Sequence, residues 1–499
     1  MDKKEGEGLS KEIKILITIC ILFTIFWIFL FIYTDTQWAQ DSHWHMKLAT
    51  NSFEGKGYTL DGVNPHGKYT PGLTILLFPF LYLGNVQVAG LFLLYILSIL
   101  SIVLTYKIGS FVNKEIGLIA GALLAFHNLF LFNSTSIMTE TPFMFFSLAA
   151  IYFFIQSYKK EIFIIPSLVF AALSILIRYD GFFLLVPFLF LILFNKVSEI
   201  KRILFSWKGA LAIISGIAIA APWFIRNYRV FGSFFYSDYT QEAAAVTIKE
   251  AIGFFGLFFK LGYLLPILAI VGLCILLFSI KDKRINALIL WFFAYLLLHA
   301  FWWARPLRFY VEVLALICFF AAVVIYFIAT KIINNKEKQK YFMLLAVLVI
   351  ASLQLFIFFS GNLNNESTID TINRYTPIRD ASVWANNNEN NTAVFIVSDY
   401  AVYSLYLNKP NIIGYQQGIQ SVAQNPSLDY FLFVDNLHPW ITKQFYGLNT
   451  FQVAFKTQDG GTITKTFKME ELKSFYYGKD SYNKGVPWET KIYKLTTTN

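Results

Sequence analysis

Residues 13–33 read IKILITICILFTIFWIFLFIY, an apolar run long enough to cross the hydrocarbon core of a bilayer as one helix. The run is longer than a signal-peptide core and lacks a small-x-small cleavage site, so we interpret it as a retained signal anchor. Over the whole chain, 56% of residues are hydrophobic and 14% are charged, against roughly a quarter charged in soluble domains. A soluble core cannot bury so many apolar runs. The sequence therefore predicts a polytopic α-helical membrane protein.

The apolar runs together predict about eleven transmembrane helices. The predicted spans are 13–33, 86–106, 115–132, 141–157, 162–177, 182–194, 210–224, 258–280, 285–303, 309–329 and 341–360. Lys and Arg gather in every second connection, which is the pattern of cytoplasmic loops. If the N-terminus is cytoplasmic, an odd number of spans places the C-terminus on the extracytoplasmic face. The net charge of +10 thus reflects topology, and we expect no nucleic-acid binding.

The composition changes near residue 362, where Asn, Asp, Thr and Tyr become frequent and the apolar runs shorten. We predict a transmembrane domain over 1–361 and a soluble, extracytoplasmic α/β domain over 362–499. In the second domain the expected strands are 392–398, 428–434, 451–456 and 462–467, and the expected helices are 378–386, 400–407 and 469–475.

The outer loop 34–85 is long, and long loops that do not resemble linkers usually carry function. Within it, Trp44, Leu48 and Phe53 would form one apolar stripe on a helix over 41–54, which predicts a helix lying in the membrane interface. The apolar segment 71–84 is too short to span comfortably, so we expect it to be interfacial or re-entrant.

Three acidic residues lie close to the outer ends of predicted spans: Asp35, Asp41 and Glu140. A carboxylate held at a membrane surface is a functional candidate, because desolvation raises its basicity. Structural roles are also open. Asp41 could cap a helix that begins at Ser42, since Asp is a preferred N-cap, and Glu140 could favour the first turn of its span through the helix dipole.

A set of cations also faces outward, against the positive-inside trend, and it lies beside several tyrosines. Its members are Lys68, Arg178, Arg226, Arg229, Arg305 and Arg308, with Tyr69, Tyr228 and Tyr310 beside them. Binding of a lipid phosphate would explain the set. The alternative is that Arg178 pairs with Asp180 and the others extend to lipid headgroups without specificity. The histidines match no standard zinc spacing, so a metal site is not expected.

Short motifs in chain order resemble the GT-C membrane glycosyltransferases that use polyprenyl-phosphate sugars. Within that group the chain looks like the protein O-mannosyltransferase and lipid A aminoarabinose transferase branch. The motifs are Asp41 before Gly55-Lys56-Gly57-Tyr58, Lys68-Tyr69-Thr70-Pro71-Gly72-Leu73, Met138-Thr139-Glu140-Thr141-Pro142-Phe143, Arg178-Tyr179-Asp180-Gly181, Pro222-Trp223-Phe224-Ile225-Arg226-Asn227 and Arg305-Pro306-Leu307-Arg308-Phe309-Tyr310. Two departures matter. Ser42 stands where many relatives carry a second acid, and the Trp-Trp-Asp motif of oligosaccharyltransferases is absent, which argues against transfer of a whole glycan to asparagine.

The resemblance implies transfer of a hexosyl or pentosyl group from a dolichyl or undecaprenyl phosphate to a hydroxyl of a protein, lipid or glycan, with inversion. Asp41 would be the base, with Asp35 and Glu140 as the other acidic candidates. Lys68, Arg226, Arg308 and Tyr310 would hold the phosphate, while Tyr69, Arg178 and Arg305 complete the substrate-binding candidates. No cofactor is expected. The protein would lie in the cell membrane, or in the endoplasmic reticulum if the cell is eukaryotic.

Two other functions remain open. A transporter or flippase of lipid-linked sugars would share the membrane architecture and the outer cations. It should show matching halves with broken spans, and the sequence has no such internal symmetry. A non-enzymatic assembly or receptor protein would bind through its C-terminal domain, and would keep its function when Asp41 becomes Asn.

Overall fold

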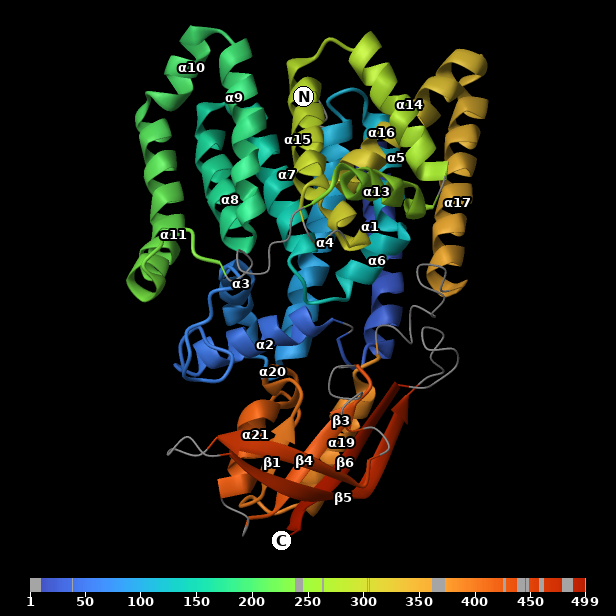
Figure 1. Cartoon of the computed structure of the whole chain (residues 1–499). Coiled ribbons are helices and arrows are strands. Elements are labelled where there is room, and N and C mark those ends of the chain that lie inside the picture. The colour runs from blue at the N-terminus through green and yellow to red at the C-terminus, as the bar shows by residue number, and fades with distance from the viewer. Residues whose placement is uncertain are drawn as a thin grey trace, which may run out of the picture. The chain divides into compact units, whose positions relative to one another are not determined.

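The computed structural model describes residues 10–37, 39–237, 246–262, 264–302, 304, 306–360, 373–424, 428–437, 445, 448–456, 462–477 and 488–498. By the density of their contacts, the residues form two compact units. Unit 1 contains Met1–Ile32 and His66–Leu363, and unit 2 contains Tyr33–Pro65 and Asn364–Asn499. Figure 1 shows the elements of both units.

Unit 1 is a bundle of helices. In the part of it that the structure describes, the α-helices are α1 (Lys11–Tyr33), α3 (Gly72–Leu81), α4 (Val86–Gly109), α5 (Lys114–Ala125), α6 (Asn128–Ser134), α7 (Glu140–Ser157), α8 (Ile164–Ile177), α9 (Leu185–Phe194), α10 (Val197–Leu204), α11 (Trp207–Phe231), α13 (Ile248–Leu257), α14 (Leu264–Ser279), α15 (Lys283–Ala300), α16 (Val311–Ile332) and α17 (Lys336–Ser360). Short 3-10 turns are η1 (Glu161–Phe163), η2 (Tyr179–Leu184), η3 (Phe258–Leu261) and η4 (Leu307–Tyr310).

Local signals set several helix ends. Asn85 and Asn113 cap α4 and α5, each accepting backbone N–H bonds from the first turn, and Ser206 caps α11 in the same way. α11 ends at Gly232, whose φ of 76° is left-handed, a conformation that glycine adopts without steric cost. The sequence thus marks where these helices begin and where α11 stops.

Among the described residues, six helices are long and apolar enough to cross a membrane: α1, α4, α11, α15, η4 with α16, and α17. Two bent pairs, α5 with α6 and α13–η3 with α14, bring the number to eight if each is one span, and their bends are 63° and 109°. Each predicted apolar run contains a helix, so the multi-pass helical fold is confirmed. The number of about eleven spans stays a prediction.

α16 is the most buried of the spanning helices, with 78% of its apolar window inside the protein. It packs against α14, α5 and α7. Gly272 of α14 lies so close to the backbone carbonyl of Phe320 in α16 that a side chain at position 272 would collide with it. Small residues permit this kind of close approach between membrane helices.

Unit 2 contains a six-stranded mixed sheet of order β2-β1-β3-β6-β5-β4. β1 (Val394–Val397) pairs in parallel with β2 (Ile412–Gly414) and β3 (Tyr430–Asp435), whereas β6 (Trp488–Thr498), β5 (Thr462–Tyr477) and β4 (Thr450–Lys456) are antiparallel. The helices among its described residues are α2 (Gln40–Phe53), α19 (Thr376–Asn388), α20 (Tyr400–Tyr403) and α21 (Tyr415–Gln424). The predicted C-terminal α/β fold is confirmed.

One predicted helix in unit 2 is wrong. Residues 469–475 continue strand β5 and pair with β6. A register shift between Glu471 and Lys473 marks a bulge. Met469, Leu472 and Phe475 stand three residues apart in the sequence, which resembles the period of a helix. In a regular strand residues three apart face opposite sides, and the bulge allows Leu472 and Phe475 to pack against the same core cluster.

The helix predicted over 41–54 is present as α2, but its N-terminus differs from the expectation. Ala39 is the N-cap residue, and no side chain caps this end. Asp41 therefore lies inside the first turn and is not the cap. Trp44 donates its indole N–H to Asp399 at 2.8 Å, and Leu48 is fully buried. Much of the apolar stripe thus packs on protein, while contact of α2 with lipid stays a prediction.

Candidate active site

The candidate residues of unit 1 lie at helix ends. Glu140 opens α7, Arg178 directly follows α8, and Arg308 lies in η4 before α16. The opposite ends of α7 and α16 lead to the basic connections predicted to be cytoplasmic. The ion pairs described below join the ends of α7, α8, α15 and α16, so they gather at one end of the bundle.

Glu140 and Arg308 form an ion pair, with Arg308 Nε 3.2 Å from Glu140 Oε1. The Glu140 side chain is 1% exposed and that of Arg308 is 22% exposed. Arg308 also directs Nη1 toward the sulfur of Met138 at 3.7 Å. A carboxylate this deeply buried requires a cationic partner, and Arg308 provides it while keeping part of its guanidinium accessible.

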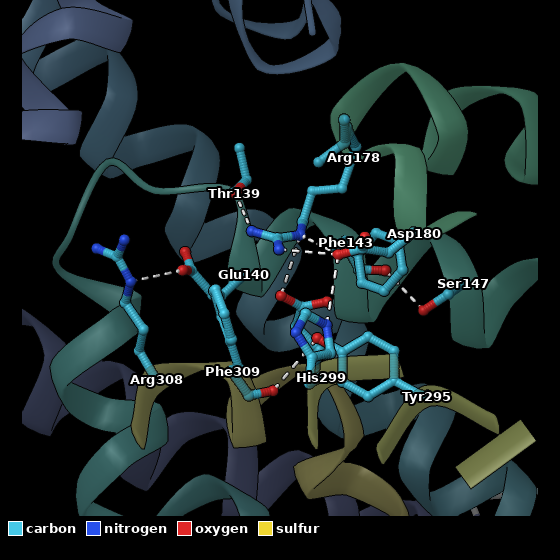
Figure 2. Close-up of polar contacts among 12 residues, drawn as sticks. Thr139, Glu140, Phe143, Ser147, Arg178, Asp180, Tyr295, His299, Arg308 and Phe309 are labelled. Carbon is cyan, nitrogen blue, oxygen red and sulfur yellow. Dashed lines mark hydrogen bonds and ion pairs between the residues drawn. The ribbon is translucent and has the colours of Figure 1, made fainter. Parts of the chain in front are cut away.

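A second group, which we call the Arg178 cluster, consists of Thr139, Arg178, Asp180 and His299 (Figure 2), together with Glu312. Arg178 contacts the Asp180 carboxylate through Nε and Nη2, both at 2.8 Å. Its Nε also lies 3.2 Å from Glu312, and its Nη1 donates to the Thr139 hydroxyl at 3.2 Å. One guanidinium thus connects α7, η2 and α16. The pairing of Arg178 with Asp180, which the sequence offered as an alternative, is present.

Aromatic rings enclose the Arg178 cluster. The guanidinium of Arg178 stacks over Phe309 at 4.9 Å, and the His299 ring lies 4.4 Å from Phe309 and 4.3 Å from Tyr295. His299 Nε2 is 3.5 Å from Asp180. Apolar rings beside charged groups lower the local dielectric and so strengthen the charge interactions inside the cluster.

Arg226 anchors another polar group. It donates Nη1 to the backbone carbonyl of His66 at 2.9 Å and lies over the rings of Trp223 and Phe231. Tyr69 is buried, and its N–H donates to His66 Nε2 at 3.2 Å. Arg226 therefore holds the segment that carries Lys68 and Tyr69.

The segment around Lys68 is also fixed to the region of Arg178. The Thr70 hydroxyl donates to the carbonyl of Ile177 at 2.7 Å. Gly72 approaches the backbone of Leu176 and Ile177 so closely that a Cβ at this position would collide with it. The Lys68 segment, the end of α8 and the Glu140 segment are thus joined by direct contacts in unit 1.

Two further candidate residues, Tyr310 and Arg305, belong to none of the polar groups described above. Tyr310 is fully buried, and its hydroxyl donates to the carbonyl of Phe254 at 2.8 Å. Its hydrogen bond is therefore already made within the protein. Arg305 lies outside the described residues.

The acidic candidates Asp35 and Asp41 belong to unit 2. Asp41 is half-buried in the first turn of α2. The Asp35 side chain is 55% exposed, and Oδ2 lies 3.6 Å from Arg379. Asp35 thus has a cationic partner in its own unit.

Asp180, His299 and Glu312 are the described residues that could together hold a metal ion, because one ligand atom from each lies within 4.8 Å of the others. Arg178 already contacts both carboxylates, so a divalent cation would compete with it for the same negative charge. The arrangement fits a guanidinium better than a metal ion.

Glu312 is the main site residue that the sequence analysis missed. Its side chain is fully buried in α16, within a run predicted as a plain transmembrane span. An acidic residue inside such a run is the signal that could have revealed it, since charges inside a membrane are costly and usually functional.

Comparison with known proteins gives one family-model match and several structural matches. Residues 67–225 match the family model of dolichyl-phosphate-mannose-protein mannosyltransferase. The matched segment begins directly before Lys68 and ends directly before Arg226, and it contains Glu140 and Arg178. No curated protein matches the chain by sequence.

The fold is similar to solved structures of ArnT and of an archaeal oligosaccharyltransferase. ArnT from Cupriavidus metallidurans bound to undecaprenyl phosphate gives a TM-score of 0.63 at 11% identity, over 98% of this chain and 98% of that chain. The oligosaccharyltransferase of Archaeoglobus fulgidus in its apo form gives 0.57 at 13% identity, over 85% and 69%. The archaeal oligosaccharyltransferase AglB in complex with an inhibitory peptide and a dolichol-phosphate gives 0.56 at 11%, over 91% and 74%. The GT-C resemblance predicted from the sequence is confirmed, and the chain has this fold.

Proposed function

We propose that this membrane protein is a glycosyltransferase that moves a sugar from a polyprenyl phosphate to an acceptor hydroxyl on the extracytoplasmic face. The observation that carries the proposal is the convergence of separate segments in unit 1. The Lys68 segment, the start of α7, the end of α8 and the end of α11 are joined by hydrogen bonds from Thr70, Arg178 and Arg226. Most of this region also lies within the family match.

The charges of this region suit a lipid-phosphate donor. Lys68, Arg226 and Arg308 supply cationic groups for the phosphate, and Glu140 orients Arg308 through their ion pair. The phosphate leaves as an already stable anion, so no general acid is required. Fixed cations stabilise the charge that develops on the leaving oxygen.

The chemical step is a single displacement with inversion. Asp41 accepts the proton of the acceptor hydroxyl while the oxygen of that hydroxyl attacks the anomeric carbon. The bond from that carbon to the phosphate oxygen breaks, and its electron pair stays on the phosphate. The products are the glycosylated acceptor and free polyprenyl phosphate. Asp35 is the weaker candidate for the base, since it pairs with Arg379.

An apolar groove in unit 1 supports a lipid carrier. Its volume is about 200 Å³, and its walls are almost entirely apolar. The lining residues are Phe255, Phe258, Phe259, Ala269, Ile270, Leu273, Phe292, Phe293, Leu296 and Phe320. Phe258 contacts the Tyr310 ring at 5.7 Å, and Tyr310 lies next to Arg308 in η4. We propose that a prenyl chain occupies this groove, with its phosphate near Arg308.

The test follows release of free polyprenyl phosphate from radiolabelled polyprenyl-phosphate sugars by the purified protein in detergent. Candidate proteins, lipids and glycans are supplied as acceptors. We expect release that depends on the acceptor, and a loss of at least tenfold in Arg308→Gln because one phosphate cation is removed. Lys338→Gln, an exposed lysine at the start of α17, is the matched control.

The same assay tests the transporter alternative. Tight binding of the lipid-linked sugar with no release in the presence of any acceptor would contradict the transferase. Movement of that lipid between the leaflets of proteoliposomes would then identify a flippase.

A further inference from the structure

One face of α2 packs on the C-terminal part of unit 2. Gln40, His43, Trp44 and Lys47 follow the i, i+3, i+4, i+7 spacing that places side chains on one side of a helix. Each of these side chains contacts a C-terminal residue: Gln40 and Trp44 contact Asp399, His43 contacts Tyr406, and Lys47 lies over the ring of Tyr400. Figure 1 shows α2 beside α20. Asp41 is thus flanked by residues whose positions the C-terminal fold determines.

Asp399 is the centre of this contact. Its Oδ2 accepts hydrogen bonds from the Gln40 amide and from the Trp44 indole, the latter at 2.8 Å. Its Oδ1 accepts the N–H groups of Ala401 and Val402 at 2.9 and 3.2 Å and thereby caps α20. The carboxylate is 8% exposed. A single buried carboxylate therefore connects α2 to the first turn of α20.

The position of Asp399 in the sheet is informative. It follows the carboxyl end of β1, and Asp435 ends the neighbouring parallel strand β3. In open α/β sheets, ligands bind outside the carboxyl ends of parallel strands. Here the hydroxyls of Ser398 and Tyr403 donate to Asp435 at 2.7 and 2.9 Å, while Asp399 receives α2. The carboxyl end of β1 therefore contacts a helix of the same chain, at the place where open α/β sheets usually bind a ligand.

His43 supports the same docking. Its ring is fully buried, with Nδ1 3.0 Å from the carbonyl of Ala39 and Nε2 3.0 Å from the Tyr406 hydroxyl. A carbonyl can only accept, so Nδ1 carries a proton and donates it to Ala39. Burial raises the pKa of Tyr406, which keeps its hydroxyl protonated as a donor.

The chain entering α2 is held as well. Asn373 accepts the backbone N–H groups of Asp35 and Thr36 at 2.8 and 3.2 Å, and its amide donates to the carbonyl of Tyr33 at 2.6 Å. The side chain of Asn373 therefore holds Tyr33, Asp35 and Thr36 in the segment before α2.

We propose that the C-terminal part of unit 2 positions the catalytic base, with Asp399 as the positioning residue that holds α2 and thereby Asp41. This inference rests on the proposed glycosyl transfer. The C-terminal part of unit 2 is then part of the active enzyme and not an appendage. The orientation of α2 depends on residues at the carboxyl end of β1.

The test uses Asp399→Asn in the full-length protein. Asn caps a helix as well as Asp does, so α20 keeps its cap. The new amide nitrogen, however, faces the donors of Gln40 and Trp44 and cannot accept from them. Asp429→Asn is the matched control. Asp429 directly precedes β3, at the opposite end of the strand from Asp435, and it pairs on the surface with Lys494.

Because a misplaced base slows the chemical step, we expect Asp399→Asn to lower kcat by about 10- to 100-fold with the donor KM within about twofold. Asp429→Asn should match the wild type. In the Asp41→Asn background, Asp399→Asn should cause no further loss, since residues that act as one unit are not additive. Faster hydrogen exchange over residues 40–53 in Asp399→Asn should accompany these changes.

An unchanged kcat in Asp399→Asn would overturn the positioning role while leaving the transferase intact. An equal further loss in the Asp41→Asn background would also overturn it, because a general loss of folding would act independently of the base. No acceptor-dependent release by the wild type would instead overturn the proposed function, whatever the exchange data show for α2.

Discussion

Two buried carboxylates, Glu140 and Glu312, each face an arginine at 3.2 Å. Burying an ionised group is costly, and a partner of opposite charge offsets that cost without usually adding net stability. Apolar side chains at these positions would fit a helix bundle at least as well. Stability alone therefore does not account for the two pairs, and the proposed function gives them a role beside the anionic donor.

The first prediction concerns Glu312. Glu312→Gln keeps the shape of the side chain but removes the charge opposite Arg178, so we expect unfolding to become easier by about 1–3 kcal/mol. Thermal unfolding of the purified protein in detergent measures this. Glu337→Gln, an exposed acid in the first turn of α17, should stay within about 0.5 kcal/mol. Equal melting of the Glu312 variant and the wild type would contradict the structural role of this pair.

At the scale of elements, helices were easier to predict than strands. Long apolar runs bounded by basic loops identified the membrane helices, because a helix that crosses a bilayer needs a long stretch of apolar residues. The second half of β5 was wrongly predicted as a helix, because Met469, Leu472 and Phe475 stand three residues apart in the sequence. The bulge and the pairing with β6 that make this segment a strand are not visible in that spacing. β2 has three residues and carries little local signal. In the candidate site, the motifs located Glu140, Arg178 and Arg308, while Glu312 was hidden inside an apolar run.

The second prediction concerns the contact between α14 and α16. Gly272→Ala places a methyl group against the Phe320 carbonyl, and overpacking of this kind costs about 1–3 kcal/mol. We expect a lower melting temperature. Gly253→Ala in α13 has open space around its new methyl group and should be neutral or slightly stabilising, because alanine favours a helix over glycine. If both variants melt alike, the close approach of α14 and α16 is not as described.

At the scale of the whole molecule, the segment Tyr33–Pro65 forms one compact unit with the C-terminal residues, although some 300 residues separate them along the chain. Neither hydropathy nor motif spacing reveals such a link, because it depends on tertiary contacts such as those of Asn373 and Asp399. Charge placement, by contrast, predicts a membrane orientation from the sequence alone.

The third prediction tests that orientation. Cysteines introduced at the exposed positions Asn390 and Lys338 should react differently with a membrane-impermeant maleimide in intact cells. We expect Asn390→Cys to be labelled from outside, because it belongs to the C-terminal unit, and Lys338→Cys to be labelled only after permeabilisation. The reverse pattern would place the C-terminal unit and the proposed active site in the cytoplasm.

The central claim is acceptor-dependent sugar transfer with Asp41 as the base, and the most direct measurement compares two matched variants in the polyprenyl-phosphate release assay. Asp41→Asn should lower kcat by about 10²- to 10⁴-fold, because the acceptor loses its general base. Asp35→Asn should retain most of the rate, since its carboxylate is 55% exposed and pairs with Arg379. Equal release by Asp41→Asn and the wild type would contradict the account.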